Sequence, residues 1–208
     1  VETLGSASVI ASDKTGTLTR NEMTVREVVT ASGHVTITGT GYAPIGDVRV
    51  DNDGEVTGNL RIELERALGV ADRANNASVR LENGRWIITG DPTEAALIVA
   101  ARKAGLQSAV LQRRFARIGE VPFSAERKLM STVHTDAETE GRVLVFTKGA
   151  PDLLLTRCTH EHVGSEHRPL SNDRRRQILE ANDALAARAL RTLGVGYRAS
   201  TDGTLSAA

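Results

Sequence analysis

The residues best suited to chemistry lie in one short run near the start of the chain, Asp13-Lys14-Thr15-Gly16-Thr17-Leu18-Thr19. The apolar run at 7–11 predicts a buried strand, so the aspartate falls where that strand ends and the chain turns. A carboxylate in this position can attack a phosphoryl group and hold it as an acyl phosphate. Hydroxyls and turn amides can bind its oxygens, while Lys14 and a divalent cation offset the charge. An aspartate-initiated turn without any chemistry is the simpler alternative.

Taken as a whole, this heptapeptide resembles the phosphorylation motif of the P-type (E1–E2) ATPases, the ATP-driven ion pumps. The resemblance implies that Asp13 is the phosphorylated nucleophile and that Lys14 and Thr15 assist it. It also implies that Asp13 and Thr15 form part of a Mg²⁺ site completed outside this chain. Phosphatases of the wider haloacid-dehalogenase-like superfamily carry a second aspartate where this chain has Thr15. Because no carboxylate stands there to activate water, the acyl phosphate is expected to persist, as a pump requires.

The composition argues against several other classes of protein. The 26 basic and 26 acidic residues cancel, so neither nucleic acid nor an anionic membrane surface is expected as a partner. The single cysteine, Cys158, excludes a disulfide within the chain and fits a reducing compartment. No apolar run approaches the ~18–20 residues of a membrane-spanning helix. The start at Val1 has neither a signal peptide nor an initiator methionine, which leads us to expect a piece of a longer protein.

Hydrophobic periodicity and turn residues predict a mixture of helices and strands. Alternation around Gly33 predicts a hairpin over 25–38, and Asn83-Gly84 predicts a tight two-residue hairpin between 78–82 and 85–89. Further strands are expected at 48–50, 129–134, 142–146 and 189–198. Helices are expected at 58–74, 92–104, 107–114, 151–157 and 171–188.

The second of these helices opens with Gly90-Asp91-Pro92-Thr93-Glu94. Asp91 suits the N-cap position, Pro92 the first helical position, and Glu94 the third position of an arrangement like a capping box. Glu94 therefore has a purely structural interpretation, as a helix cap. The same five residues resemble the nucleotide-binding domain of type II P-type pumps. That resemblance implies that Glu94 accepts a hydrogen bond from the amino group of adenine.

A second segment of the same kind runs from Phe123 to Ser131. A phenylalanine is usually a core residue, but this one stands beside a charged cluster, where an exposed ring can stack on a base. The segment resembles the adenine-binding segment of the sarcoplasmic-reticulum calcium pump and its relatives. The resemblance implies that Phe123 stacks on adenine and that Lys128 and Met130 line the site. Ala125 stands where the calcium pump has an arginine that helps hold the phosphates, so weaker ATP binding is expected.

Two more segments complete the expected nucleotide site. Thr147-Lys148-Gly149-Ala150-Pro151 resembles the Lys-Gly-Ala-Pro motif of the same pumps, which implies that Lys148 and Gly149 lie at the nucleotide. A solvated lysine at a strand end is the alternative, although a lysine facing a helix N-terminus favours an anion between them. The resemblance also implies that Arg191 contacts an ATP phosphate and that Leu193 lines the site. A charge placed near a helix terminus is the alternative for Arg191.

One cluster raises the question of a metal site. Cys158, His160 and His162 alternate, so a strand would place them on one face, with His167 nearby, and zinc accepts such ligands. Their spacing fits no standard zinc finger, and the pumps carry a similar Cys-Thr-His without metal, so a structural role is favoured. Residues 165–170 look like the Ser-Glu-His-Pro motif of heavy-metal pumps, but Arg168 interrupts it, and we do not assign that function.

The chain is therefore interpreted as the nucleotide-binding domain of a type II, calcium-pump-like P-type cation pump. The resemblance implies an α+β fold with a twisted antiparallel sheet of about six strands flanked by helices. We expect residues 1–24 to belong to the phosphorylation domain, 25–198 to the nucleotide-binding domain, and 199–208 to a return hinge or tail. The chain near Thr24 and near Ala199 should then lie side by side.

The expected cofactors are ATP and Mg²⁺. The expected partners are the remaining phosphorylation, actuator and transmembrane domains of the same pump, with the fragment itself soluble, monomeric and catalytically incomplete. The location implied is the cytoplasmic side of a membrane pump, whose transported cation this chain does not identify. Two alternatives remain open: a soluble haloacid-dehalogenase-like phosphatase or phosphotransferase, and a nucleotide-binding regulatory module.

Overall fold

A computed structural model of the chain describes residues 22–50 and 54–200. The proposed catalytic residues Asp13, Lys14 and Thr15 and the segment 201–208 lie outside the described residues. Within them the chain forms the following strands and helices in order: β1 Glu27–Val29, β2 His34–Ile37, β3 Val48–Arg49, α1 Gly58–Arg73, β4 Ser78–Glu82, β5 Arg85–Thr89, α2 Pro92–Lys103, α3 Ser108–Arg114, β6 Phe115–Val121, β7 Leu129–Asp136, β8 Val143–Gly149, α4 Pro151–Arg157, β9 His160–Val163, β10 Glu166–Pro169, α5 Asn172–Ala187 and β11 Gly194–Ser200.

The largest sheet in the described part has four strands in the order β11-β8-β7-β6, and every neighbouring pair is antiparallel. The remaining strands form a three-stranded sheet, β1-β2-β3, and two hairpins, β4-β5 and β9-β10. The α+β class with antiparallel sheets is thus confirmed. The expectation of a single sheet of about six strands differs from this arrangement, in which the strands are divided among four sheets.

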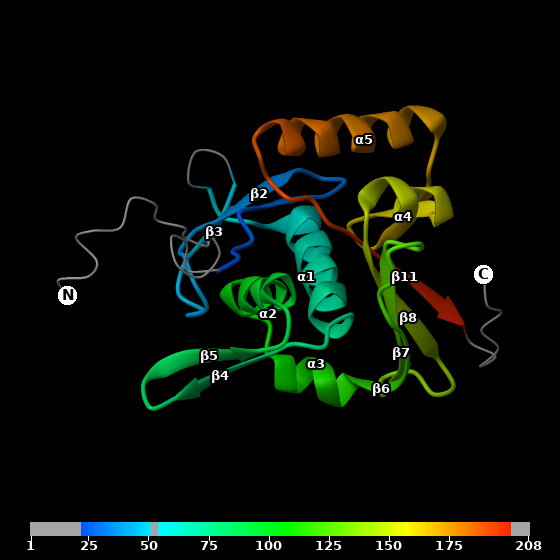
Figure 1. Ribbon diagram of the computed structural model, residues 1–208. Coiled ribbons are helices and arrows are strands. Elements are labelled where there is room, and N and C mark those ends of the chain that lie inside the picture. Colours follow the sequence, from blue (N-terminus) through cyan, green and yellow to red (C-terminus); the bar gives the residue numbers. More distant parts are fainter. Residues whose placement is uncertain (1–21, 51–53, 201–208) are drawn as a thin grey trace, which may run out of the picture.

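Helix α1 forms the centre of the fold and lies between the two larger sheets (Figure 1). Leu64 and Leu68 on one side pack with β2 and α2 in a hydrophobic cluster. Val70, near its C-terminal end, packs with Leu144 and Phe146 of the four-stranded sheet. Burial of such apolar side chains supplies the main driving force of folding, so α1 joins the two halves of the molecule.

A buried acid also ties α1 to its surroundings. Glu63 is only 4% exposed. Its Oε2 accepts the backbone N–H of Ser32 at 2.9 Å, and its Oε1 accepts the Ser32 hydroxyl and the Gly164 backbone N–H, each at 2.6 Å. One carboxylate therefore connects α1 with the β1–β2 turn and the β9–β10 turn.

The β4–β5 hairpin follows the tight turn that its sequence predicts. Asn83 and Gly84 both have positive φ, 48° and 76°, as the two central residues of a type I′ turn require. The hairpin packs against α2 through a cluster that includes Val79, Trp86 and Ile88. It extends away from the rest of the fold (Figure 1).

Helix α5 covers the top of the molecule in Figure 1 without burying any of its own residues. Ser171 caps it as predicted, because its hydroxyl accepts the backbone N–H of Arg174 at 3.1 Å. Near this end, Arg175 donates to the backbone carbonyls of Leu155 and Cys158. Near the other end, Arg188 pairs with Glu27 of β1. Polar contacts at both ends therefore hold a helix that contributes nothing to the core.

Two expectations about the end of the described chain are wrong. The last strand begins at Gly194 and not at residue 189. The first described segment and the end of β11 lie on opposite sides of the molecule and not side by side (Figure 1). The domain boundaries expected near residues 24 and 198 stay proposals. In the described residues, no helix combines the length and the apolar character needed to cross a membrane.

Candidate functional site

A buried ion pair joins two of the predicted site residues from distant parts of the chain. Lys148, near the end of β8, lies with its Nζ 2.6 Å from Oε1 of Glu94 in the first turn of α2. Met130 of β7 is the direct cross-strand neighbour of Lys148, so both lie on the same face of the sheet. The side chains of Lys148 and Glu94 are 8% and 15% exposed. Three residues singled out from separate motifs are thus brought together.

The pair compensates an unfavourable location for a lysine. Burial lowers the pKa of Lys148 because water no longer solvates its ammonium, while the hydrogen bond to Glu94 and the negative charge of Asp91 act in the opposite direction. A buried charge of this kind is stable only beside an opposite charge. Lys148 is therefore no solvated lysine at a strand end, and that alternative is wrong.

The N-terminus of α2 is capped by Asp91 and not by Glu94. Asp91 Oδ1 accepts the backbone N–H groups of Thr93 at 2.7 Å and Glu94 at 3.2 Å. Burial acts to raise the pKa of Asp91, but these hydrogen bonds and the charge of Arg191 bring it below its ordinary value. Glu94 directs its carboxylate to Lys148 and to the backbone N–H of Asn76, the latter at 3.0 Å. Its side chain is thus engaged by groups outside its own helix.

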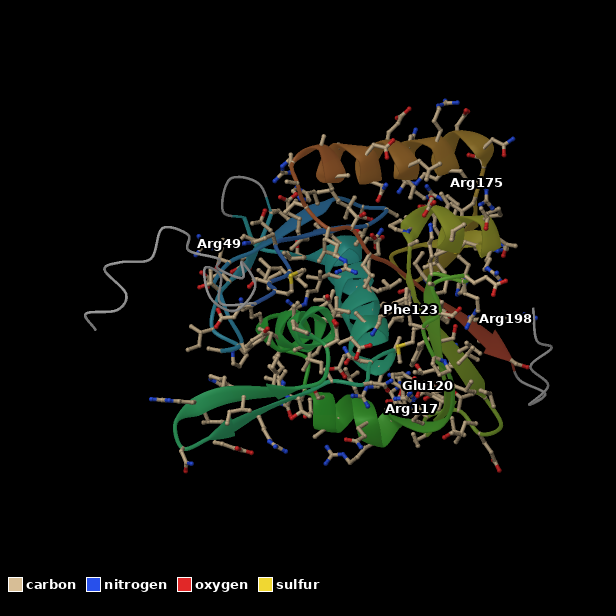
Figure 2. The ribbon with its side chains drawn as sticks, viewed as in Figure 1. Arg49, Arg117, Glu120, Phe123, Arg175 and Arg198 are labelled. Carbon is tan, nitrogen blue, oxygen red and sulfur yellow. The ribbon has the colours of Figure 1, made fainter. Side chains whose placement is uncertain are left out.

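The sequence did not predict a polar network that contacts Glu94. The Asn76 amide donates to Glu120 Oε1 at 2.8 Å and accepts from Arg117 Nη1 at 2.7 Å, and Arg117 pairs with Glu120 at 2.5 Å. Figure 2 shows Arg117 and Glu120 close together beside the sheet. Residues three apart on a regular strand point to opposite faces, but the register of β6 shifts between Arg117 and Gly119. No signal in the sequence predicts this bulge.

The two motif segments after residue 120 meet through their backbones. The carbonyl of Lys128 accepts the N–H of Ala150 at 3.0 Å, so the Phe123–Ser131 segment lies against the start of α4. Gly149 is needed at this contact, because a Cβ there would come within 2.2 Å of the Lys128 carbonyl oxygen. Phe123 is 62% exposed, so the interpretation as a core residue is wrong (Figure 2). The Lys128 side chain is exposed as well.

Arg191 and Leu193 lie in the link between α5 and β11. Arg191 is exposed, and its charge acts on the carboxyl of Asp91, which places it on the side of the molecule where α2 begins. Leu193 is partly buried. The structure therefore brings Glu94, Met130 and Lys148 into direct proximity and places Arg191 near them, while Phe123 and Lys128 extend into solvent.

The histidines raised as metal ligands have other partners. His162 lies between Arg66 Nη1, 2.5 Å from its Nδ1, and the Tyr197 hydroxyl, 2.6 Å from its Nε2. Burial and the charge of Arg66 lower its pKa to about 4. The Cys158 thiol donates to the carbonyl of Leu154 at 3.3 Å. Among the residues that the structure describes, no group of three or more His, Cys, Asp or Glu side chains is arranged to hold a metal ion.

These features define an α+β domain in which a charged site lies between an antiparallel sheet and the start of a helix. A family model described as P-type ATPase, cytoplasmic domain N, matches residues 63–207. The chain belongs to this family, as a type II P-type ATPase nucleotide-binding fragment.

Several curated proteins resemble almost the whole chain. A calcium-transporting ATPase of Bacillus subtilis is 38% identical over 198 residues, which cover 95% of this chain and 22% of that protein. A probable cation-transporting ATPase F of Mycobacterium bovis is 40% identical over 201 residues, which cover 96% of this chain and 21% of that protein. Calcium-transporting ATPase type 2C member 1 of Bos taurus is 37% identical over 198 residues, covering 94% and 20%. The chain thus spans about a fifth of the length of these relatives.

Proposed function

We propose that this chain binds ATP as the nucleotide-binding domain of an ATP-driven cation pump that forms an aspartyl phosphate. The observation that carries the proposal is the buried contact between Lys148 and Glu94, which places a cation and a hydrogen-bond acceptor beside the sheet. An adenine base presents complementary groups, because it carries an amino donor next to ring nitrogens that accept hydrogen bonds. The relatives named as calcium- or cation-transporting ATPases support the same conclusion.

In the proposed complex Glu94 accepts the adenine amine and the exposed ring of Phe123 stacks on the base. Lys128 and Arg191 supply positive charge for the phosphates, and Lys148 lies beside Glu94 at the base. Met130, Gly149 and Leu193 form apolar and backbone parts of the site. Lys148 occupies one oxygen of Glu94 in the present structure. An incoming base therefore has to share or replace that contact, which favours modest affinity, as does Ala125 in place of an arginine.

The proposed phosphorylation step uses Asp13, which lies outside the described residues. Its carboxylate would attack the terminal phosphoryl group in line, with ADP as the leaving group. Mg²⁺, when bound, would neutralise charge on the phosphate oxygens, and Asp13 and Thr15 fit as two of its oxygen ligands. Further proposed partners are the other phosphorylation, actuator and transmembrane domains of the pump, with this domain on the cytoplasmic side of the membrane.

The test is a titration of the isotope-labelled 208-residue chain with ATP, followed by amide NMR shifts and calorimetry. Shifts are expected around Glu94, Phe123 and Lys148. Phe123→Ala should weaken binding by about 5- to 150-fold, because base stacking contributes ~1–3 kcal/mol. Leu81→Ala is the matched control, since Leu81 is also exposed, at 58%, and lies on the β4–β5 hairpin.

Two results would contradict the proposal. If ATP causes no shifts at these segments at millimolar concentration, the chain is no nucleotide-binding domain. If Phe123→Ala and Leu81→Ala bind ATP equally well, stacking on Phe123 has no part in binding. The Lys148→Ala variant completes the set and is expected to weaken ATP binding, with Arg176→Ala on the exposed face of α5 as the cationic control.

A further inference from the structure

The Glu94 carboxylate is held from two sides. Its Oε1 meets the Lys148 ammonium at 2.6 Å, and its Oε2 accepts the backbone N–H of Asn76 at 3.0 Å. The first partner stands at the end of a long flexible side chain. The second is a main-chain group whose position depends on how the loop between α1 and β4 is anchored. The orientation of the carboxylate therefore depends on that loop.

The loop is anchored by the side chain of Asn76 itself. Its amide nitrogen donates to Glu120 at 2.8 Å and its amide oxygen accepts from Arg117 at 2.7 Å, and these two residues pair with each other. Asparagine suits this position because it offers a donor and an acceptor on one short, planar group. Although Asn76 is exposed, it is therefore fixed to the edge strand β6 at both ends of its amide.

Asn75 and Gly90 also restrain the loop between α1 and β4. Asn75 donates to the backbone carbonyl of Glu94 at 2.8 Å and accepts the N–H of Ala77 at 2.8 Å. Gly90 stands just before the cap of α2, and a Cβ added there would lie 2.9 Å from the Ala77 Cα. Since the loop is in close contact with the start of α2, a change in its anchor is transmitted directly to Glu94.

The geometry points to Asn76 as a positioning residue that aims the Glu94 carboxylate at the exocyclic amine of adenine and so sets a preference for adenine over guanine nucleotides. The inference rests on the function proposed above. Adenine presents an amino donor where guanine presents a carbonyl acceptor. A carboxylate held in one orientation accepts from the first and repels the second, whereas a carboxylate free to turn away discriminates less. Asn76 acts through Glu94 and touches no nucleotide itself.

The test compares dissociation constants for ATP and GTP, measured by calorimetry on the 208-residue chain. Asn76→Asp places a carboxylate opposite Glu120, and the affinity ratio of ATP to GTP is expected to fall by about 3- to 10-fold, as expected for the loss of a hydrogen bond. The double variant Asn76→Asp/Glu120→Gln exchanges the amide and the carboxylate and should restore the ratio. Asn172→Asp, at the exposed start of α5, is the matched control and should leave it unchanged.

The possible outcomes separate the two proposals. If the unchanged chain binds neither nucleotide, the proposed function fails, and this inference fails with it. If it prefers ATP and Asn76→Asp keeps the same ratio, or if the double variant does not restore it, the inference alone is overturned. Urea unfolding shows whether Asn76→Asp is folded. Should it unfold, Asn76→Ser, which removes both side-chain contacts without adding charge, must lower the ratio for the inference to stand.

Discussion

Glu63 Oε1 lies 2.6 Å from the backbone nitrogen of Gly164, although the two residues stand 101 positions apart in the chain. The same carboxylate also accepts from Ser32, so one side chain of α1 fixes two turns from opposite parts of the sequence. Hydrogen bonds to an ionised group are stronger than neutral ones, and the carboxylate has little access to water. Much of the arrangement around α1 thus depends on a single charge.

Glu63→Gln should therefore lower the free energy of unfolding by about 1–3 kcal/mol, because an amide cannot satisfy all three donors. Burial acts to raise the pKa of Glu63, but the hydrogen bonds from Ser32 and Gly164 bring it below its ordinary value of 4.5. A lowered pKa in the folded state contributes stability above pH 4.5 that is lost as the pH falls further. The acid-induced loss should accordingly be smaller in Glu63→Gln.

Urea unfolding between pH 3 and pH 7 measures both effects. Glu65→Gln is the matched control, since Glu65 lies on the same helix, its side chain is 42% exposed, and within the described residues it forms its ion pair with Arg61. It should change stability by no more than about 0.5 kcal/mol. Equal losses in the two variants would show that the buried carboxylate contributes no more than a surface one.

Because His134 is buried, we expect a second pH dependence of the folding stability, in a different pH range. It is 1% exposed, and its ring nitrogens lie 3.1 Å from the Phe115 carbonyl and 2.9 Å from the Thr132 hydroxyl. Burial lowers its pKa from 6.5 to about 4. The unfolded chain therefore binds a proton at this histidine more readily than the folded chain does. The free energy of unfolding should be highest above pH 6.5 and should fall by about 3 kcal/mol between pH 6.5 and pH 4.

The variant His134→Gln removes this titration and should flatten the fall in stability between pH 6.5 and pH 4. His160→Gln is the control, because His160 is exposed and its ring contacts only the neighbouring Thr159 hydroxyl among the hydrogen bonds of the described chain. Chemical unfolding at several pH values compares the slopes. An unchanged slope in His134→Gln would assign the pH dependence to another group, of which His162, also with a pKa of about 4, is the first candidate.

Gly149→Ala tests the contact between the two motif segments. The added methyl group would lie 2.2 Å from the Lys128 carbonyl oxygen and 2.8 Å from the Leu129 Cα, so the backbone must move. We expect a loss of stability of at least about 2 kcal/mol and weaker ATP binding. Gly84→Ala is the control, since no atom lies within 4 Å of a Cβ there and only its φ of 76° opposes the change. Thermal unfolding and ATP titration decide, and a variant as stable as the control would contradict this packing.

The fourth prediction concerns catalysis by the 208-residue chain alone. Phosphoryl transfer requires in-line placement, a bridging metal and several donors, and loss of one stabilising donor can cost ~10²–10³ in rate. This chain spans about a fifth of the length of these relatives. We propose that residues outside it complete the catalytic site. We expect no acid-stable label after incubation with γ-labelled ATP and Mg²⁺. Label that appears, and is lost in Asp13→Asn, would show instead that the chain is catalytically sufficient.

Local chemistry explains which elements the sequence predicts well. The turn at Asn83-Gly84, the cap at Asp91 and the cap at Ser171 all occur as expected, because each depends on residues within a few positions of one another. The motifs also identified Glu94 and Lys148, but only the fold shows that they form an ion pair. That contact requires a helix and a strand whose separation in space no local pattern encodes.

The start of the last strand shows what local patterns miss. The sequence leads us to expect a strand from residue 189, yet β11 begins only where Gly194 pairs with Gly149, the last residue of β8. Beyond Gly149 the chain provides no further strand residues that could pair with β11, because α4 begins at Pro151. A strand ends where its partner ends, so its length is a property of the pair.

Trp86 is the only tryptophan in the chain, and it lies partly buried on the β4–β5 hairpin against α2. The guanidinium of Arg102 stands 5.9 Å from its ring, and Ala95, next to Glu94, belongs to the same cluster. The emission of a single indole therefore offers an intrinsic optical reporter for the packing of the hairpin against α2. If ATP binds as proposed and alters this packing, we expect its binding to change the fluorescence without a dye, a label or an introduced residue.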